Sequence, residues 1–511
     1  MNRTIEQLSY ADAFVRTLPA DPRSDNTLRQ VLGSCYSRVA PTGVQKPELL
    51  ALVPEVCELI DLTPTPTPEL ADVLAGNRVV PGMAPYAACY GGHQFGTWAG
   101  QLGDGRAITL GEVTNTRGET WELQLKGAGP TPYSRRADGR AVLRSSLREL
   151  VCSEAMFHLG VPTTRALSLA LTGEPVERDI LYDGHPRMEP GAVVCRVAPS
   201  FLRFGSYEIH TSRDDHKTLA ALVDFTMERH FPHAKGDVVA MFAEVVQTTA
   251  FMVSEWLRVG FVHGVMNTDN MSILGLTIDY GPYGWLEPFD LDWTPNTTDA
   301  SGRRYRYGNQ PQIAQWNLAQ LGRALIPLVG DPEPLQRVVT EFPRRFAQLH
   351  RHSMLRKLGL TGRADTHSDD DELLGDLATL LVAHPTDMTI AYRALADGTL
   401  SDAFYGAPSP EHVTRWERWR GAYARRARVE GISDAERVTR MNTVNPIYVP
   451  RNYVVQEVIE ATEKGDRADL AKLLDVLRDP YTQRPGLERY AGKRPAWAEN
   501  KAGCSMLSCS S

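Results

Sequence analysis

The fold of this chain is decided by the stretch His263-Gly-Val-Met-Asn-Thr-Asp269-Asn270-Met-Ser-Ile-Leu-Gly-Leu-Thr-Ile-Asp279-Tyr-Gly281. It follows residues 238–259, whose apolar spacing is typical of a long helix. The pair Asp269-Asn270 precedes an apolar segment, which we expect to form a short strand pair, and Asp279 comes nine residues after Asn270. Carboxylate and amide oxygens in such a pattern are suited to bind a divalent cation. The alternative for the first pair is a simple Asx turn.

This order of polar residues is typical of kinase-like enzymes. They place a base Asp and a metal-binding Asn in a catalytic loop, ahead of an Asp-Phe-Gly motif whose Asp also binds metal. Asn270 and Asp279 match the two metal positions, but Val265 stands where small-molecule kinases of this fold carry the base. Asp269 is therefore the candidate proton acceptor, in a shifted position immediately before Asn270.

A second set of kinase-type residues lies upstream. The segment 89–106 is rich in glycine, so its backbone is expected to cover phosphates closely. Two strands are predicted over 107–113 and 120–125, the second ending at Lys126, and Glu149 follows 23 residues later within a predicted helix over 140–159. A lone lysine at a strand end is usually solvated, but this combination predicts a phosphate-binding lysine oriented by a helix glutamate.

Two arginines add more positive charge than a simple kinase requires. Further strands are predicted over 165–170 and 192–197, and Arg196 and Arg203 lie seven residues apart across the end of the second. Guanidinium groups bind phosphate in a bidentate manner, so with Arg106 and Lys126 they suit a triphosphate. The alternative is surface salt bridging. Glu177-Arg178-Asp179 imitates a kinase catalytic loop, but its place before Arg196 and the absence of a following Asn exclude it.

The order of these segments predicts an α+β, bilobal protein-kinase-like fold with a β-rich N-lobe and a mainly helical C-lobe. Helical patterning that includes residues 49–52 predicts an N-terminal helical extension, and the Thr-Pro run at 63–68 predicts a stiff connector before the organised core. Helices are also predicted over 218–229 and 238–259. The expected parts are 1–78 (N-terminal helical extension), 79–200 (N-lobe), 201–360 (C-lobe) and 361–511 (C-terminal helical region with a cysteine-containing tail).

Composition narrows the class of protein. A chain of 511 residues with 42% apolar content can bury a large core. Its net charge of −7 is unfavourable for binding a polyanion, so no nucleic-acid partner is expected. No signal peptide and no apolar stretch of about 18 residues is recognisable, so no membrane partner is expected. Seven scattered cysteines argue against a secreted disulfide framework, and we expect a cytoplasmic protein.

Several longer motifs resemble those of the selenoprotein O family. They are Tyr90-Gly-Gly-His-Gln-Phe-Gly96, Gln101-Leu-Gly-Asp-Gly-Arg106, Gln124-Leu-Lys-Gly-Ala-Gly129, Glu189-Pro-Gly-Ala192, the stretch from His263 to Pro282, and Asn309-Gln-Pro311. The resemblance implies a protein-kinase-like fold and transfer of AMP from ATP to Ser, Thr or Tyr hydroxyls of proteins. It also implies a flipped nucleotide, pyrophosphate as leaving group, and Mg²⁺ or Mn²⁺ as cofactor.

The resemblance also assigns site residues by position. It implies nucleotide contacts from Gly103, Gly105, Arg106, Lys126, Asp138, Gly139, Arg196, Arg203 and Asp279, an ion pair of Lys126 with Glu149, metal binding by Asn270 and Asp279, and Asp269 as proton acceptor. The alternatives are a conventional kinase that transfers the γ-phosphate and a silent nucleotide-binding pseudokinase.

The tail departs from the family pattern. Cys504 and Cys509 are separated by four residues where relatives commonly have two, and no cysteine follows Asp290 closely, which puts a redox role for the tail in doubt. The alternatives are a disulfide between Cys504 and Cys509 and an unpaired, reducible thiol.

Overall fold

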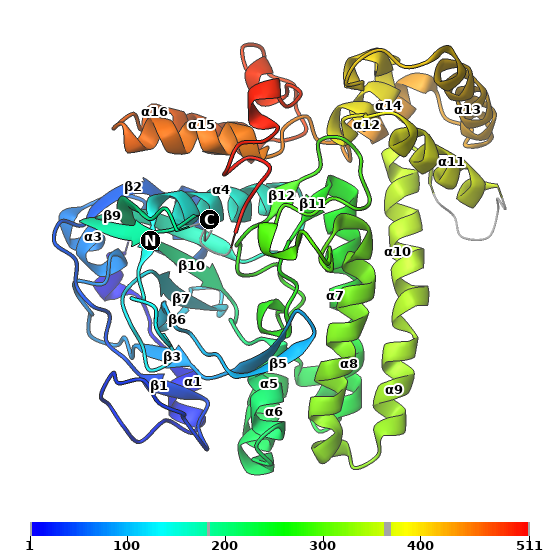
Figure 1. Cartoon of the computed structure of the whole chain (residues 1–511). Coiled ribbons are helices and arrows are strands. Elements are labelled where there is room, and N and C mark those ends of the chain that lie inside the picture. Colours follow the sequence, from blue (N-terminus) through cyan, green and yellow to red (C-terminus); the bar gives the residue numbers. More distant parts are fainter. Residues whose placement is uncertain (1–2, 181–183, 362–368, 509–511) are drawn as a thin grey trace.

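The computed structural model describes residues 3–180, 184–361 and 369–508 (Figure 1). Its N-terminal part is rich in sheet and its C-terminal part is helical, so the predicted α+β class is confirmed. The main sheet is antiparallel and has the order β1-β3-β6-β7-β10-β9-β2, with β8 paired to β10. Its strands are β1 (Tyr36–Arg38), β2 (Glu48–Leu52), β3 (Tyr86–Ala88), β6 (Ala107–Thr114), β7 (Thr120–Lys126), β8 (Ala141–Val142), β9 (Arg165–Arg178) and β10 (Arg187–Ala198).

The β6–β7 hairpin confirms the two strands predicted over 107–113 and 120–125. Its register pairs Ala107 with Lys126, so the lysine lies at the end of its strand beside the loop that precedes β6. Strands β9 and β10 run beyond their predicted ends because their outer halves pair with each other, after a bulge at Pro190.

The prediction of an N-terminal helical extension is wrong for residues 49–52. They lie in β2, which pairs with β9, and β1 pairs with β3, whereas the local helices are short: α1 (Ala13–Thr17), α2 (Pro54–Leu59) and α3 (Pro68–Leu74). A four-residue apolar run fits a strand as well as a helix, and the edge of β9 supplies its backbone partners. Val56 and Ile60 are fully buried, so the organised core begins before the Thr-Pro run, contrary to expectation.

Helix α4 (Leu143–His158) packs against the sheet through Leu147, Leu150 and Val151, all fully buried. It starts three residues later than predicted because Ala141 and Val142 pair with β10. Helices α15 (Asn452–Glu463) and α16 (Ala468–Arg478) return from the C-terminal part and cover α4 (Figure 1). Helices from the C-terminal end of the chain therefore form part of the core of the sheet-rich part.

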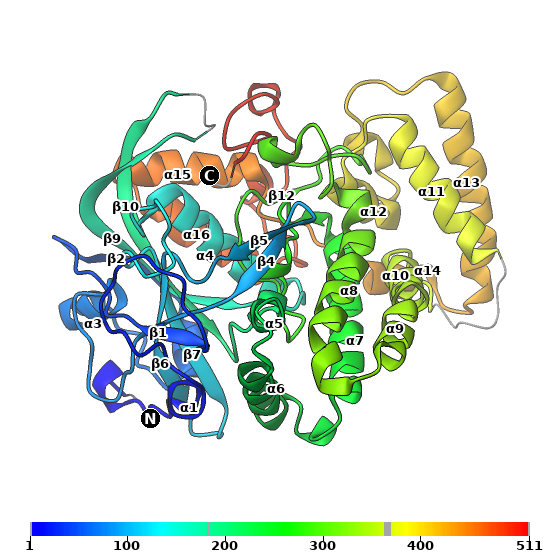
Figure 2. The same ribbon diagram turned by 60° about the horizontal axis from the view of Figure 1, so that its bottom comes forward.

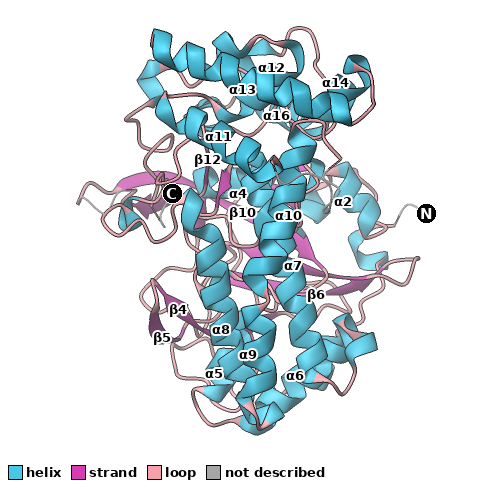
Figure 3. Cartoon of the chain, turned by 90° about the vertical axis from the view of Figure 1, so that its right-hand side faces the viewer, coloured by secondary structure: helices cyan, strands magenta, loops and turns pink. Residues whose placement is uncertain are grey.

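The helical part contains the two helices predicted there. They are observed as α6 (His216–His230) and α7 (Val238–Val259), and their neighbours are α5 (Phe204–Thr211), α8 (Gln310–Val329), α9 (Pro332–Thr340) and α10 (Phe342–Lys357). Helix α7 has the length and apolar content of a membrane span, but α8, α9 and α10 pack around it (Figure 3). Trp256 and other apolar side chains of α7 are buried there, as in the core helix of a globular protein.

The remaining elements flank these two parts. Helices α11 (Asp370–Ala383), α12 (Met388–Asp397), α13 (Pro410–Val429) and α14 (Asp434–Asn442) form an outlying group beyond α10 (Figure 2). Two small two-stranded sheets are formed by β4 (Gly91–Gln94) with β5 (Thr97–Gln101) and by β11 (Phe261–Val262) with β12 (Gly284–Trp285). The strand pair predicted between Asn270 and Asp279 is reduced to a single bridge, Met271 to Thr277.

Candidate active site

A cavity of about 620 Å³ lies where the sheet meets the helical part. It is lined by nine of the residues predicted from the sequence: Gly103, Gly105, Arg106, Lys126, Asp138, Gly139, Arg196, Asn270 and Asp279. The other three predicted residues contact this lining without being part of it: Glu149 pairs with Lys126, Arg203 pairs with Asp279, and Asp269 precedes Asn270 in the chain. Residues separated by up to 176 positions along the chain are thus brought together around one space.

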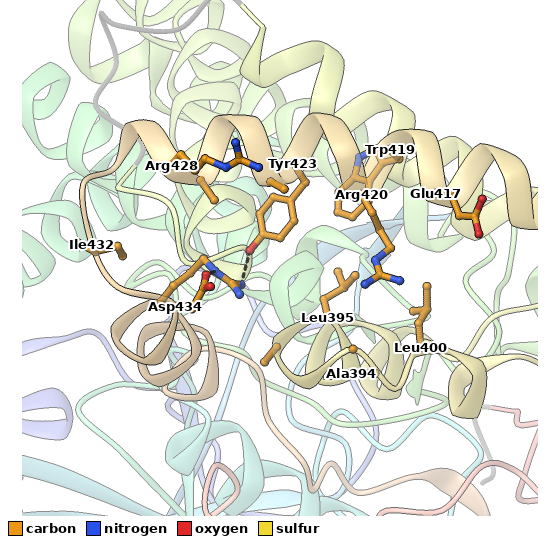
Figure 4. Close-up of a pocket in the computed structure, with 15 residues that line it drawn as sticks. Ala394, Leu395, Leu400, Glu417, Trp419, Arg420, Tyr423, Arg428, Ile432 and Asp434 are labelled. Atoms are coloured by element: carbon orange, nitrogen blue, oxygen red, sulfur yellow. Dashed lines mark hydrogen bonds and ion pairs between the residues drawn. The ribbon is translucent and has the colours of Figure 1, made fainter.

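A second groove, of about 700 Å³, lies between α12, α13 and α14 (Figure 4). Figure 4 shows Arg420 and Tyr423 of α13 facing Ala394 and Leu395 of α12. None of the predicted site residues lines this groove. The smaller cavity, which is lined by the predicted site residues, is therefore the candidate active site.

Lys126 and Glu149 form a buried ion pair at the inner wall of the cavity. The Lys126 Nζ donates to Glu149 Oε2 at 2.5 Å, and Arg196 donates to Glu149 Oε1 at 3.1 Å. Burial lowers the pKa of Lys126; Glu149 opposes this shift, while Arg106 and Arg196 add to it. Glu149 is thus shared by two cations and holds both at the cavity wall.

Asp279 lies between the two arginines. Arg196 donates to Oδ1 at 2.6 Å and Arg203 donates to Oδ2. Burial alone raises the pKa of this carboxyl, but Arg203, Arg196 and Lys126 outweigh it and hold the pKa of Asp279 well below its usual range. The residue adopts a left-handed conformation with φ of 56°, which Asp tolerates better than most side chains. Asp279 is therefore kept ionised and faces the cavity.

Asn270 lines the cavity beside Asp279 with its orientation fixed. Its amide Nδ2 donates to the carbonyl oxygen of Val265 at 2.9 Å, which leaves the amide oxygen for a cation. Among the residues that the structure describes, no group of three His, Cys, Asp or Glu side chains could hold a metal ion alone. One carboxylate and one amide, completed by phosphate oxygens, is the kind of site at which Mg²⁺ binds with a nucleotide. The donor set therefore fits a metal that arrives with a nucleotide.

Asp269 occupies a very different environment from Asp279. It is 7% exposed, its Oδ2 accepts from Gln94 Nε2 at 3.2 Å, and its Oδ1 is buried with no hydrogen-bond partner. Burial raises the pKa of Asp269 to about 7, and the Gln94 hydrogen bond opposes that shift. A carboxylate with a pKa near neutrality and one unengaged oxygen is suited to accept a proton.

The comparison with known proteins places this site in a family. Residues 24–478 match the sequence profile described as "Protein adenylyltransferase SelO". The chain belongs to this family. Proteins named "Protein nucleotidyltransferase YdiU" are 56% identical in Aromatoleum aromaticum, over 99% of this chain and 100% of the relative, and 55% identical in Rhodopirellula baltica, over 99% of each. The sequence-based prediction of a protein nucleotidyltransferase is thereby confirmed.

One solved structure shows a much weaker likeness. It is the Toxoplasma gondii protein ROP2, described as a virulence factor with a protein-kinase fold and no enzymatic activity. The identity is 13% over 57% of this chain and 86% of that chain, and the TM-score is 0.23. At this TM-score the likeness supports no inference about the SelO-family chain.

The glycine-rich segment 89–106 was predicted to form one loop over the phosphates, but only its last part lines the cavity of this SelO-family chain together with Tyr90. Gly103 and Gly105 line the cavity, but β4 and β5 form a hairpin that packs on Thr268 and Asp269. The backbone N–H of His93 in β4 donates to Thr268 Oγ1 at 2.7 Å. The β4–β5 hairpin could not be predicted from the glycine content, because glycines mark turns and loops alike and do not show which part of the segment pairs as strands.

Several residues that support the arginines were missed from the sequence. Gln124 Oε1 accepts from Arg196, and the Tyr90 ring lies 4.4 Å from the Arg203 guanidinium carbon. Asp104 is buried 4.0 Å from Arg203. A signal for Gln124 was present, because alternation along a strand places it on the same face as Lys126.

Asp138 and Gly139 form another part of the cavity wall. Asp138 pairs with Arg178 at 2.8 Å, so the arginine of the rejected catalytic-loop imitation is a structural partner. Gly139 has φ of 71°, and a Cβ there would overlap the carbonyl of Gly129. Any larger residue at 139 would therefore displace this wall.

Glu149→Gln is expected to reduce kcat/KM for ATP about tenfold or more, because Lys126 and Arg196 would lose their shared counter-charge. Steady-state kinetics over a range of ATP concentrations measures this effect. Glu463→Gln, the same change on the exposed surface of α15, is the matched control. An unchanged kcat/KM in Glu149→Gln would show that the pair does not position the nucleotide.

Proposed function

We propose that this SelO-family chain transfers the adenylyl group of ATP to Ser, Thr or Tyr hydroxyls of other proteins and releases pyrophosphate. The observation that carries the proposal is the convergence of Lys126, Arg196 and Arg203 on Asp279 at the inner wall of the cavity. Lys126 and Arg196 line the cavity, and Arg203 holds Asp279 from behind. Two cations beside a carboxylate that can bind a metal suit the release of pyrophosphate better than the transfer of the terminal phosphate.

In the proposed arrangement the β- and γ-phosphates lie against Arg106, Lys126 and Arg196. Gly103 and Gly105 let the backbone approach the nucleotide, and Asp138 and Gly139 complete the wall. Arg203 is fully committed to Asp279 and to the carbonyl oxygen of Asp269, the latter at 2.7 Å. It acts through Asp279 rather than by direct contact with ATP, which modifies the role expected from the sequence.

Asn270 and Asp279 would hold a divalent cation, Mg²⁺ or Mn²⁺, together with phosphate oxygens. When bound, the ion would neutralise phosphate charge and orient the triphosphate. The two arginines keep Asp279 ionised, and the Val265 carbonyl keeps the Asn270 amide in place, so both ligands are prepared before the ion binds.

The transfer requires one proton acceptor and one leaving group. Asp269 accepts the hydroxyl proton on Oδ1, and the acceptor oxygen forms a bond to the α-phosphorus. The bond from the α-phosphorus to the bridging oxygen breaks, and its electron pair leaves with pyrophosphate. Lys126 and Arg196 stabilise the charge that develops on this group without having to reorganise, because Glu149 and Asp279 already hold them.

The proposal extends to the protein-kinase-like arrangement of the chain and to a cytoplasmic location. The strand-end Lys126 paired with a helix glutamate, and the loop pair Asn270 and Asp279 that lines the same cavity, support the kinase-like arrangement. The net charge of −7 supports protein rather than nucleic-acid substrates.

Phosphorus NMR of the reaction mixture tests this function. The chain is incubated with ATP, Mg²⁺ or Mn²⁺, and casein as a protein acceptor. We expect pyrophosphate to accumulate in step with acceptor modification. Accumulation of ADP in its place would identify a conventional kinase, and intact ATP under all conditions would favour the silent scaffold.

A further inference from the structure

The β4–β5 hairpin is not part of the main sheet and reaches across to the helical part (Figure 2). Its turn, Phe95-Gly96, has two positive φ angles, 51° and 88°, as in tight two-residue hairpin turns. The hairpin packs on α5 and on the 3₁₀ turn Thr268–Asn270. It therefore contacts the catalytic loop on a side that does not line the nucleotide cavity.

Polar contacts at consecutive positions join the hairpin to this loop. His93 N–H donates to Thr268 Oγ1 at 2.7 Å, Gln94 Nε2 donates to Asp269 Oδ2 at 3.2 Å, and Phe95 N–H donates to Asn267 Oδ1 at 3.2 Å. The His93 ring is anchored in turn, with Nδ1 at 2.5 Å from Glu208 Oε2 of α5. A set of contacts this regular holds the loop in one conformation relative to the hairpin.

The hairpin makes a hydrogen bond to only one of the two carboxylate oxygens of Asp269. Gln94 engages Oδ2, whereas Oδ1 is buried, has no hydrogen-bond partner and lies against Gly92. A Cβ at position 92 would overlap Oδ1, so only glycine leaves room for the carboxylate. Burial of an unpaired carboxylate oxygen is unfavourable. Such an oxygen is explained if it gains a hydrogen-bond partner at another stage of the reaction.

We propose that the β4–β5 hairpin is the acceptor-side element of the site, and that Gln94 is a positioning residue for Asp269. By holding Oδ2, Gln94 directs Oδ1 toward the place where the acceptor hydroxyl delivers its proton. Gly92 covers this place in the present structure, so the backbone at Gly92 moves aside when an acceptor enters, while Gln94 keeps its hydrogen bond to Oδ2. This inference rests on the proposed function, since it assigns the protein-substrate side of the same site.

Gln94→Met tests the inference, because methionine keeps the length of the side chain and removes the donor. We expect kcat for transfer to casein to fall at least about tenfold, with the KM for ATP and the melting temperature unchanged. Gln336→Met, on the exposed face of α9, is the matched control. A purely structural role would lower the melting temperature and leave kcat per folded molecule unchanged.

The outcomes separate the two proposals. If the parent chain modifies casein with AMP but Gln94→Met does so at the parent kcat, Gln94 does not position the base and the inference is overturned. A fall in ATP affinity with an unchanged kcat would also overturn it, because it would assign the hairpin to the nucleotide. If the parent chain itself transfers no AMP, the proposed function fails before the variant is compared.

Discussion

Asp279→Asn is expected to reduce adenylyl transfer by about 100- to 1,000-fold or more. The change removes the carboxylate that both arginines hold and that we expect to bind the metal, while the shape of the side chain is kept. Label transfer from ATP to casein over a range of Mg²⁺ and Mn²⁺ concentrations measures the loss. Asp376→Asn, the same change on the exposed face of α11, is the matched control.

Stability must be measured beside this loss of activity. Arg196 and Arg203 are 2% exposed, and removing the partner of a buried charge typically costs about 3–5 kcal/mol. Asp279→Glu keeps the charge but moves it, so we expect this variant to stay folded and to remain nearly inactive. A folded Asp279→Asn chain with undiminished metal-dependent transfer would reject the assignment of the site.

Asp269→Asn is expected to lower kcat by about 100- to 10,000-fold and to leave ATP affinity nearly unchanged. Asparagine has the shape of the carboxylate but cannot accept the hydroxyl proton. Asp269 is not among the residues that line the nucleotide cavity, which is why binding is expected to survive. Single-turnover kinetics with casein gives the rate of transfer, and isothermal titration with ATP gives the affinity.

The matched control for this prediction is Asp224→Asn on the exposed face of α6. If Asp269→Asn retains the parent kcat, the proton leaves by another route and the shifted-base assignment is wrong. If ATP affinity falls with kcat, Asp269 belongs to the nucleotide site instead.

Much of the catalytic arrangement could be predicted from local patterns. The alternation in β7 located the strand that ends at Lys126, and helical spacing placed Glu149 on the helix beside it. The structure brings these two side chains together at 2.5 Å. Such residues are predictable because each sits at a fixed place in a regular element, and the element itself is readable from its apolar period.

Features that depend on long-range pairing were not predictable in this way. Residues 48–52 became a strand because β9 offered a free edge, and that edge is more than 100 residues away in the sequence. The contact of Gln94 with Asp269 spans 175 positions. Neither residue carries a local signal of its partner, so only the folded chain reveals how the hairpin is related to the base.

Backbone hydrogen bonds hold the described part of the carboxy-terminal tail, in which Cys504 is a free cysteine. The N–H of Leu507 donates to the carbonyl of Pro295 at 3.0 Å, and the N–H of Thr297 donates to the carbonyl of Leu507 at 2.7 Å. Cys504 is buried, which raises the pKa of its thiol to about 11 and makes it a poor nucleophile at neutral pH. Cys509 lies outside the described residues.

The central claim is that AMP, rather than phosphate, is transferred to protein. It is tested most directly with ATP labelled at the α-phosphate in one reaction and at the γ-phosphate in another, each with casein and with Mg²⁺ or Mn²⁺. The account predicts that label stays on casein only when it starts at the α-phosphate. Label that reaches casein only from the γ-phosphate would contradict the account and make the chain a kinase.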